Sequence, residues 1–168
     1  MYHSGEFFVM NLPKRKPNRL KNYDYSQNGG YFITFCTKDR APILSSIVVG
    51  KAALRLPRVE LTEYGRITET YIQNIPMVYP HILVENYVIM PNHVHLLLLV
   101  GDGGQGAARP TISGVVRSVK ALVRKETGKS LFQSSFYDRL IRDEADFLLH
   151  WDYIASNPGK WVEDEYHL

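Results

Sequence analysis

The sequence contains one cysteine, Cys36, among its 168 residues. A single cysteine excludes an internal disulfide and any zinc site built from several cysteines, and it favours a reducing cytosol. Long apolar runs are also missing, because the longest uninterrupted one is Leu96–Val100, far below the ~20 residues needed to cross a bilayer. The N-terminus lacks the basic-then-apolar order of a signal peptide. The sequence therefore predicts no membrane contact.

The size and composition favour one globular domain. Hydrophobic residues make up 45% of the chain, enough for a core, and the length is typical of a single domain. The first thirty residues are basic and interrupted by prolines, so we expect an N-terminal arm over residues 1–30 and one domain over residues 31–168. We find no internal repeat.

Charge is divided unevenly along the chain. Residues 138–168 carry a net charge of −5, whereas residues 1–137 carry +8. This asymmetry is typical of a body that binds a polyanion, although an unevenly charged surface without a partner would have the same composition.

The hydrophobic pattern predicts alternating strands and helices. We expect strands at 31–37, 82–90, 93–100 and 136–141, and helices at 61–74, 112–127 and 144–157. The four leucines Leu96–Leu99 do not alternate with polar residues, so their strand should be central and covered on both faces. The order β, α, β, β, α, β, α predicts an α+β fold with helices packed on an antiparallel sheet.

The helix expected at 112–127 is strongly amphipathic. Its apolar positions recur with helical spacing, and Arg117, Lys120 and Arg124 lie off the apolar stripe as a basic ridge. Gly128 follows as the expected C-terminal cap. The stretch Gly128-Lys129-Ser130 resembles the end of a phosphate-binding loop, but Val123 occupies the position where that motif needs glycine. We therefore predict no nucleotide site here.

His93 and His95 are the strongest candidates for chemistry. Residues i and i+2 of a strand point to the same face, so the two imidazoles could converge on one divalent cation. A pair of half-buried histidines with ordinary hydrogen bonds would have the same spacing. Two histidines are also an incomplete metal site, which needs a further ligand or water.

The last helix offers a further polar pair. We expect its apolar stripe to consist of Phe147, Leu148, Trp151, Ile154 and Ala155. Tyr153 falls almost opposite that stripe, and Asn157 lies one turn later on the side of Tyr153. The alternative is an exposed tyrosine and an asparagine that caps the helix before Pro158. His150 shares the face of Tyr153, and we expect a surface or structural role for it.

These residues resemble a known family. The segments Tyr87–Leu98 and Tyr153–Pro158 resemble the single-tyrosine HUH (histidine, hydrophobic, histidine) transposases, and in particular the REP-associated tyrosine transposases of bacteria. Further similarity lies in Asn22–Gly29, Phe136–Glu144 and Asn157–Trp161. The resemblance spans residues 16–161. It implies a ferredoxin-like α+β fold of the HUH endonuclease type, with the histidine pair on a central strand and the tyrosine on a C-terminal helix.

The resemblance also implies a reaction. In this family the tyrosine attacks a phosphodiester of single-stranded DNA beside a hairpin, which leaves a 5′-phosphotyrosine link and a 3′-hydroxyl. By this resemblance Tyr153 is the nucleophile, His93 and His95 bind a divalent metal (Mg²⁺ or Mn²⁺), and Asn157 completes the metal site in place of a glutamine common in relatives. The expected protein is a monomer or homodimer of the bacterial cytoplasm.

DNA binding is expected to use basic residues that contact the phosphate backbone. We predict two groups of contacts, one in the N-terminal arm and one on the amphipathic helix. They are Lys14, Arg15, Lys16 and Arg19 in the arm, and Arg117, Lys120 and Arg124 on the helix.

Two other functions remain open at this point. A small α+β sheet can bind hairpin DNA without catalysis, as a domesticated transposase would. A metal phosphohydrolase could use the histidine pair with a water nucleophile, but it would need more carboxylates than the sequence places beside His93 and His95.

Overall fold

A four-stranded antiparallel sheet forms the centre of the structure, whose computed structural model describes residues 28–48, 57–101 and 111–163. Its strand order is β4-β5-β1-β6, and α1 and α3 connect its strands. This is the split β-α-β arrangement of ferredoxin-like folds, so the predicted α+β fold is confirmed. The bounds are β1 Gly29–Cys36, α1 Glu63–Gln73, β4 Ile82–Ile89, β5 His93–Val100, α3 Ile112–Thr127 and β6 Tyr137–Ile141.

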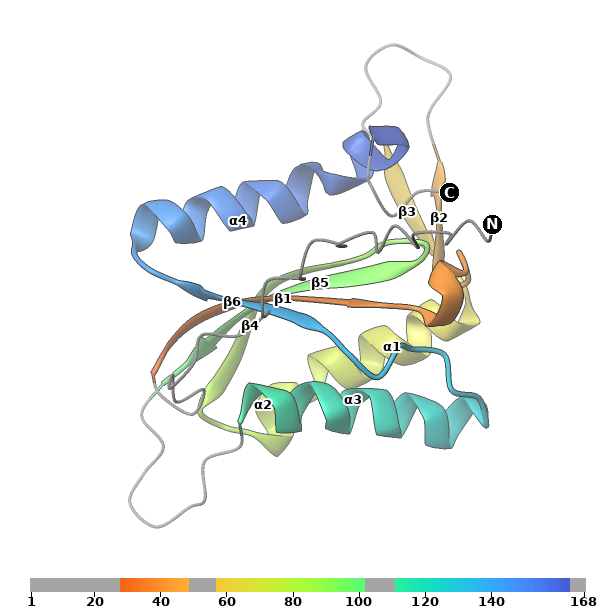
Figure 1. Cartoon of the computed structure of the whole chain (residues 1–168), viewed down its shortest axis with the longest axis horizontal. Helices are drawn as coiled ribbons and strands as arrows, with labels where there is room; N and C mark the ends of the chain where they lie inside the picture. The colour runs from red at the N-terminus through yellow and green to blue at the C-terminus, as the bar shows by residue number, and fades with distance from the viewer. Residues whose placement is uncertain (1–27, 49–56, 102–110, 164–168) are drawn as a thin grey trace, which may run out of the picture.

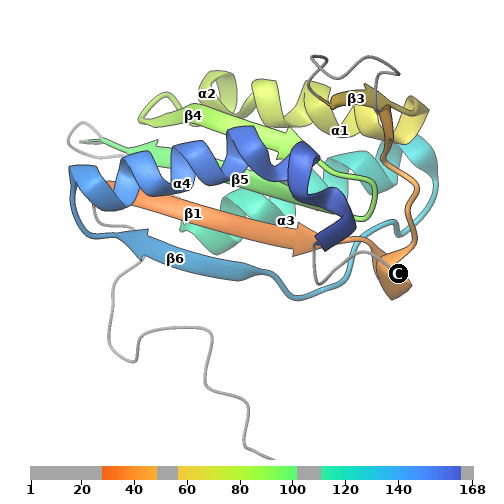
Figure 2. The ribbon, with the colours of Figure 1, turned by 90° about the horizontal axis from the view of Figure 1, so that it is seen from above.

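Helices cover both faces of the sheet (Figure 1). On one face lie α1, α3 and the short α2 (Ile75–Val78), and on the other lies α4 (Glu144–Ser156), which continues into the 3₁₀ segment η2 (Asn157–Glu163). Figure 2 shows α4 running along the sheet, where it contacts β4, β5 and β6. None of the helices in the described ranges is long and apolar enough to span a membrane.

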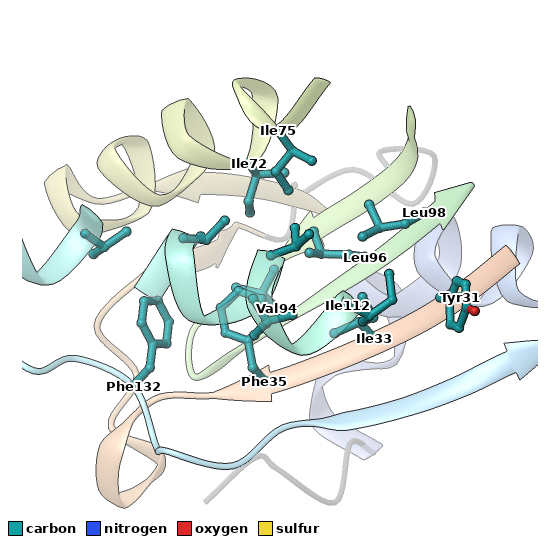
Figure 3. Close-up of a cluster of buried hydrophobic side chains, with 14 of the residues drawn as sticks. Tyr31, Ile33, Phe35, Ile72, Ile75, Val94, Leu96, Leu98, Ile112 and Phe132 are labelled. Carbon is teal, nitrogen blue, oxygen red and sulfur yellow. The ribbon is translucent and has the colours of Figure 1, made fainter. Parts of the chain in front are cut away.

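The central strand β5 is buried on both faces, as its leucine run predicts. Leu96 and Leu98 belong to the main core beneath α1 and α3, together with Ile33 and Phe35 of β1 (Figure 3). Leu97 points to the opposite face and packs with Phe32 and Ile154 under α4. Because side chains alternate along a strand, His93 and His95 share the α4 face with Leu97.

The crossover helix α3 begins and ends as its sequence predicts. The hydroxyl of Thr111 accepts a hydrogen bond from the amide of Gly114 at the N-terminus. At the C-terminus Gly128 has φ 69°, a left-handed conformation that glycine adopts without strain. The apolar stripe of α3, including Val115, Val119 and Val123, is buried against the sheet.

Several short elements differ from the prediction. A two-stranded sheet forms from β2 (Ser45–Val48) and β3 (Arg58–Leu61), and a 3₁₀ turn η1 (Lys38–Arg40) follows β1. Leu61, the expected start of a helix, ends β3 instead, and Thr62 caps α1. Strand β1 begins at Gly29, two residues before the expected strand. The sequence did not predict the β2–β3 pair because tertiary packing stabilises it: Ile47 and Val59 pack against the cluster that contains Ile154.

The predicted N-terminal arm lies almost wholly outside the described residues, which begin at residue 28. Its proposed DNA contacts Lys14, Arg15, Lys16 and Arg19 are therefore outside the described part of the chain, and they stay predictions.

Helix α1 packs tightly against the backbone of Leu44 at Gly65. A Cβ atom on Gly65 would lie 2.1 Å from the backbone oxygen of Leu44, which accepts a hydrogen bond from the amide of Thr62. We expect Gly65→Ala to lower the free energy of unfolding by about 1–3 kcal/mol, measured by urea denaturation. Gly114→Ala in α3 is the matched control, because a Cβ there meets only Thr111 Oγ1 at 3.5 Å. The account of this contact is wrong if both variants have the stability of the wild type.

Candidate active site

The histidine pair lies in the interior of the molecule, at the start of β5. His93 is 0% exposed and His95 2% exposed, and their ring centroids are 4.6 Å apart. The structure thus brings the two imidazoles together on the α4 face of the sheet, as the spacing predicts. The two histidines are fully buried rather than half-buried, and their role as metal ligands stays a prediction.

Each histidine has a partner that orients its ring. The Nδ1 atom of His93 lies 2.7 Å from Oδ1 of Asn92, to which it donates. The Nδ1 atom of His95 lies 2.7 Å from the hydroxyl of Thr34, its cross-strand neighbour on β1. These contacts engage the δ nitrogens of both rings, and the ε nitrogen of His95 has no hydrogen-bond partner among the described residues. Second-shell groups commonly orient metal-binding histidines in this way.

Electrostatics favour the neutral form of His95. Burial lowers the pKa of His95 well below its usual range, and the nearby His93 and His150 lower it further. A neutral imidazole carries the lone pair that a metal ion needs. At neutral pH, protons therefore compete weakly with a metal ion for the lone pair of the His95 imidazole.

Helix α4 brings Tyr153 to the histidine pair. The ring centroid of Tyr153 lies 5.2 Å from that of His95, edge-on, and 5.9 Å from that of Phe32. Besides the packing of Ile154 on Phe32 and Leu97, Asp146 binds Arg139 of β6 at 3.1 Å, and Asn86 of β4 donates to the backbone oxygen of Trp151. Tyr153 is 38% exposed, so its ring contacts His95 while part of it stays open to a substrate.

Asn157 lies one turn after Tyr153, at the junction of α4 and η2. Its side chain is 2% exposed, and its oxygen is buried without a hydrogen-bond partner in the described part of the chain. Four residues later, Trp161 stacks on His93 at 6.2 Å between centroids. Asn157 is also the C-cap residue of α4, as the alternative predicts, and its backbone amide donates to the oxygen of Ile154; capping alone does not account for the buried side-chain oxygen.

The predicted apolar stripe of α4 is confirmed for Ile154 and Phe147, which pack on the sheet, and is wrong for Leu148, Trp151 and Ala155, which are exposed. Leu148 is 53% exposed and Trp151 37% exposed, whereas the buried residues of the helix are His150 and Ile154. The reason is that the sheet presents Phe32 and His95 to the helix, so the face that meets them is partly polar. His150, expected to have a surface or structural role, is a site residue that we missed. Its position three residues before Tyr153 was the available signal.

A groove of about 910 Å³ runs past Tyr153. Its lining includes His95, His150 and Phe32, and three cationic side chains, which are Arg40, Arg139 and Lys160. Arg40 and its neighbour Asp39 have φ values of 54° and 55°, a conformation that non-glycine residues seldom adopt. None of the three cations was predicted, because they come from three separate elements.

The basic ridge of α3 lies on the other face of the sheet. Arg117, Lys120 and Arg124 line a second groove of about 1180 Å³, and Arg117 and Arg124 are exposed. Lys120 also has a structural use, since its ammonium group donates to the backbone oxygens of Gln133 and Ser135 at 2.8 and 2.9 Å. The role of all three residues in DNA binding stays a prediction.

The partial burial of Lys120 predicts a pH-dependent stability. Burial lowers the pKa of Lys120 to about 8. The unfolded chain therefore binds more protons than the fold between pH 8 and the ordinary lysine pKa of about 10.4, so this group makes the fold more stable as pH rises through that window. We expect Lys120→Met to lose this gain, measured by urea denaturation at pH 7.5, 9 and 10. Lys125→Met, at an exposed position of the same helix, should retain it, and equal pH dependence in Lys120→Met and the wild type would contradict the assignment.

The donor set fits a divalent cation. The ε nitrogen of His95 and the side-chain oxygen of Asn157 are both buried without hydrogen-bond partners among the described residues. Such atoms are costly to bury unless something binds them. No three His, Cys, Asp or Glu side chains cluster as metal ligands in the described ranges.

Comparisons with known proteins agree with the predicted resemblance. No protein-family model matches the chain. An uncharacterized protein from Haemophilus influenzae is 29% identical over 92% of this chain and 93% of its own length. A second protein of that organism, provisionally named a REP-associated tyrosine transposase, is 26% identical over 84% of this chain and 77% of its own length. The solved structure of a REP-associated tyrosine transposase bound to a REP hairpin has a TM-score of 0.62 at 21% identity, covering 85% of this chain and 74% of that one.

Proposed function

We propose that this chain, which has the HUH-type fold of the REP-associated tyrosine transposases, is a metal-dependent transposase of single-stranded DNA. Tyr153 attacks a phosphodiester beside a DNA hairpin, forming a 5′-phosphotyrosine link and releasing a 3′-hydroxyl. The observation that carries the proposal is the contact between Tyr153 and His95, 5.2 Å between ring centroids, inside a groove open to solvent. A nucleophile beside a buried histidine pair is what this chemistry requires.

The charge of the groove supports a DNA substrate. Arg40, Arg139 and Lys160 line it beside Tyr153, where they would contact the phosphates that flank the scissile bond. The unusual backbone conformation of Arg40 supports a role for that side chain, since strained residues cluster at functional sites. On the other face, Arg117 and Arg124 offer further cations for a longer DNA.

His93, His95 and Asn157 would hold the cation. When bound, a divalent ion offsets the negative charge that develops on the scissile phosphate. Thr34 and Asn92 orient the two imidazoles, so little reorganisation is needed when the ligands bind. A shell of nitrogen and oxygen donors suits Mn²⁺ well and Mg²⁺ adequately. Tyr153 would keep its link to DNA until a 3′-hydroxyl attacks it, so strand transfer needs no nucleotide cofactor.

The proposal is tested with labelled hairpins that carry single-stranded flanks, taken from the DNA around the gene. Protein, hairpin and Mn²⁺ are incubated and separated on a denaturing gel. The expected result is a slowly migrating band that protease treatment removes. Specific hairpin binding without such a band would reject the transposase and favour the non-catalytic hairpin-binding module.

A further inference from the structure

A third histidine lies in the groove, outside the proposed metal set. His150 is 6% exposed and lines the groove beside Tyr153. Its ring packs on Phe32 at 4.6 Å between centroids, and Phe32 also contacts His95 and Tyr153. The ring of Phe32 thus contacts the candidate nucleophile Tyr153, the candidate metal ligand His95 and the imidazole of His150. The ring of His150 is neither part of the apolar core nor among the donors assigned above to the cation.

The orientation of His150 is set from one side. Its Nδ1 atom lies 2.7 Å from the backbone oxygen of Asp146, to which it donates, and 3.4 Å from the Asp146 carboxylate. That carboxylate is itself held by Arg139 and by the backbone amide of Arg142. The ring therefore cannot turn freely, and Nε2 is the nitrogen that remains for a substrate in the groove. This is the arrangement by which a proton-transferring histidine is commonly oriented.

The spacing of His150 and Tyr153 suits the two ends of one phosphate. They are three residues apart on α4, which is about 4.5 Å along the helix axis, and both side chains reach the groove. In phosphoryl transfer the attacking and leaving oxygens lie roughly in line on opposite sides of the phosphorus. A phosphate seated between the two side chains would meet Tyr153 on one side and His150 on the other.

We propose that His150 is the general acid that protonates the leaving 3′-oxygen of DNA, an inference that rests on the proposed function. The bond from the Tyr153 oxygen to phosphorus forms as the bond from phosphorus to the 3′-oxygen breaks. The electron pair of the broken bond stays on the 3′-oxygen, which takes the proton from Nε2 of His150. The phenolic proton of Tyr153 passes to water, and water reprotonates His150. In strand transfer His150 accepts the proton of the attacking 3′-hydroxyl.

A substrate with a better leaving group separates this role from a structural one. A hairpin with sulfur in place of the scissile 3′-oxygen releases a thiolate, which needs no proton at the moment of cleavage. His150→Asn keeps a donor near Nδ1 that can bind the Asp146 backbone oxygen, and His150→Gln is a second variant with an amide nearer Nε2. Both are compared with the wild type and with Leu148→Ala, an exposed position on the outer side of α4, after thermal melts have identified the folded variants.

The expected result is selective. Single-turnover cleavage of the oxygen substrate falls by about 10²–10⁴-fold in both His150 variants, whereas the sulfur substrate is cleaved within a few-fold of the wild-type rate. Leu148→Ala should cleave both substrates normally. Equal slowing of both substrates, or normal cleavage of the oxygen substrate by a folded His150 variant, would overturn the role of His150 while leaving the transposase proposal intact. Failure of the wild type on both substrates would overturn the proposed function and this inference with it.

Discussion

Tyr153→Phe loses the covalent protein–DNA product, with a rate at least about a thousandfold below that of the wild type, on the scale of nucleophile replacements in other covalent enzymes. The phenyl ring retains the contacts with His95 and Phe32, so only the hydroxyl is removed. Hairpin affinity should therefore be retained. The measurement is the rate of adduct formation on a labelled hairpin with Mn²⁺, read on a denaturing gel.

Another tyrosine provides the matched control for this variant. The hydroxyl of Tyr64 accepts a hydrogen bond from Lys129, and its ring packs with the core on the α1 and α3 side of the sheet. Tyr64→Phe should form adduct at the wild-type rate. If Tyr153→Phe also forms adduct at that rate, Tyr153 is not the nucleophile and the proposed chemistry is wrong.

The second large effect concerns the cation. His95→Ala is expected to weaken Mn²⁺ binding by more than about 100-fold, because removing a ligand should cost at least as much as removing its hydrogen-bond partner. Titration calorimetry with Mn²⁺ on the wild type and on His95→Ala measures this difference without any DNA. The pKa of His95 is lowered well below its usual range. Protonation of this histidine should therefore contribute little to any change in Mn²⁺ affinity between pH 7.5 and pH 6.

Two further variants calibrate the metal measurement. Thr34→Val removes the hydroxyl beside Nδ1 of His95 and should weaken Mn²⁺ binding by about 10–100-fold. His81→Gln changes a histidine outside the lining of the groove and should bind like the wild type. Wild-type affinity in His95→Ala would remove His95 from the metal site.

The sequence predicted the central strands and the α3 crossover well, because their signals are local. The strand predicted at 93–100 matches β5 at both ends, and Thr111 and Gly128 bound α3 where the hydrophobic stripe predicts. The spacing of His93 and His95 also predicted their common face. These features depend on strand alternation and helix capping, which involve residues close together in sequence.

The rest of the site depends on contacts between distant segments. The face of α4 that meets the sheet is decided by Phe32 and His95, so its own pattern of leucine and tryptophan was misleading and His150 was overlooked. Arg40, Arg139 and Lys160 reach one groove from η1, β6 and η2. The hydrogen bonds from Lys120 to the backbone oxygens of Gln133 and Ser135 could not be predicted from the sequence either, because they join α3 to a separate segment of the chain. The hydrophobic pattern of one helix or strand does not reveal which side chains of a neighbouring element will pack against it.

The most direct test of the central claim is the chemical identity of the protein–DNA link. The adduct formed on a hairpin in Mn²⁺ is digested with protease and nuclease, and the modified peptide is identified by mass spectrometry. The account predicts a single modified residue, Tyr153, joined to a 5′-phosphate, together with a released strand that ends in a 3′-hydroxyl. A link on another residue, a 3′-phosphate link, or specific hairpin binding without any link would contradict it.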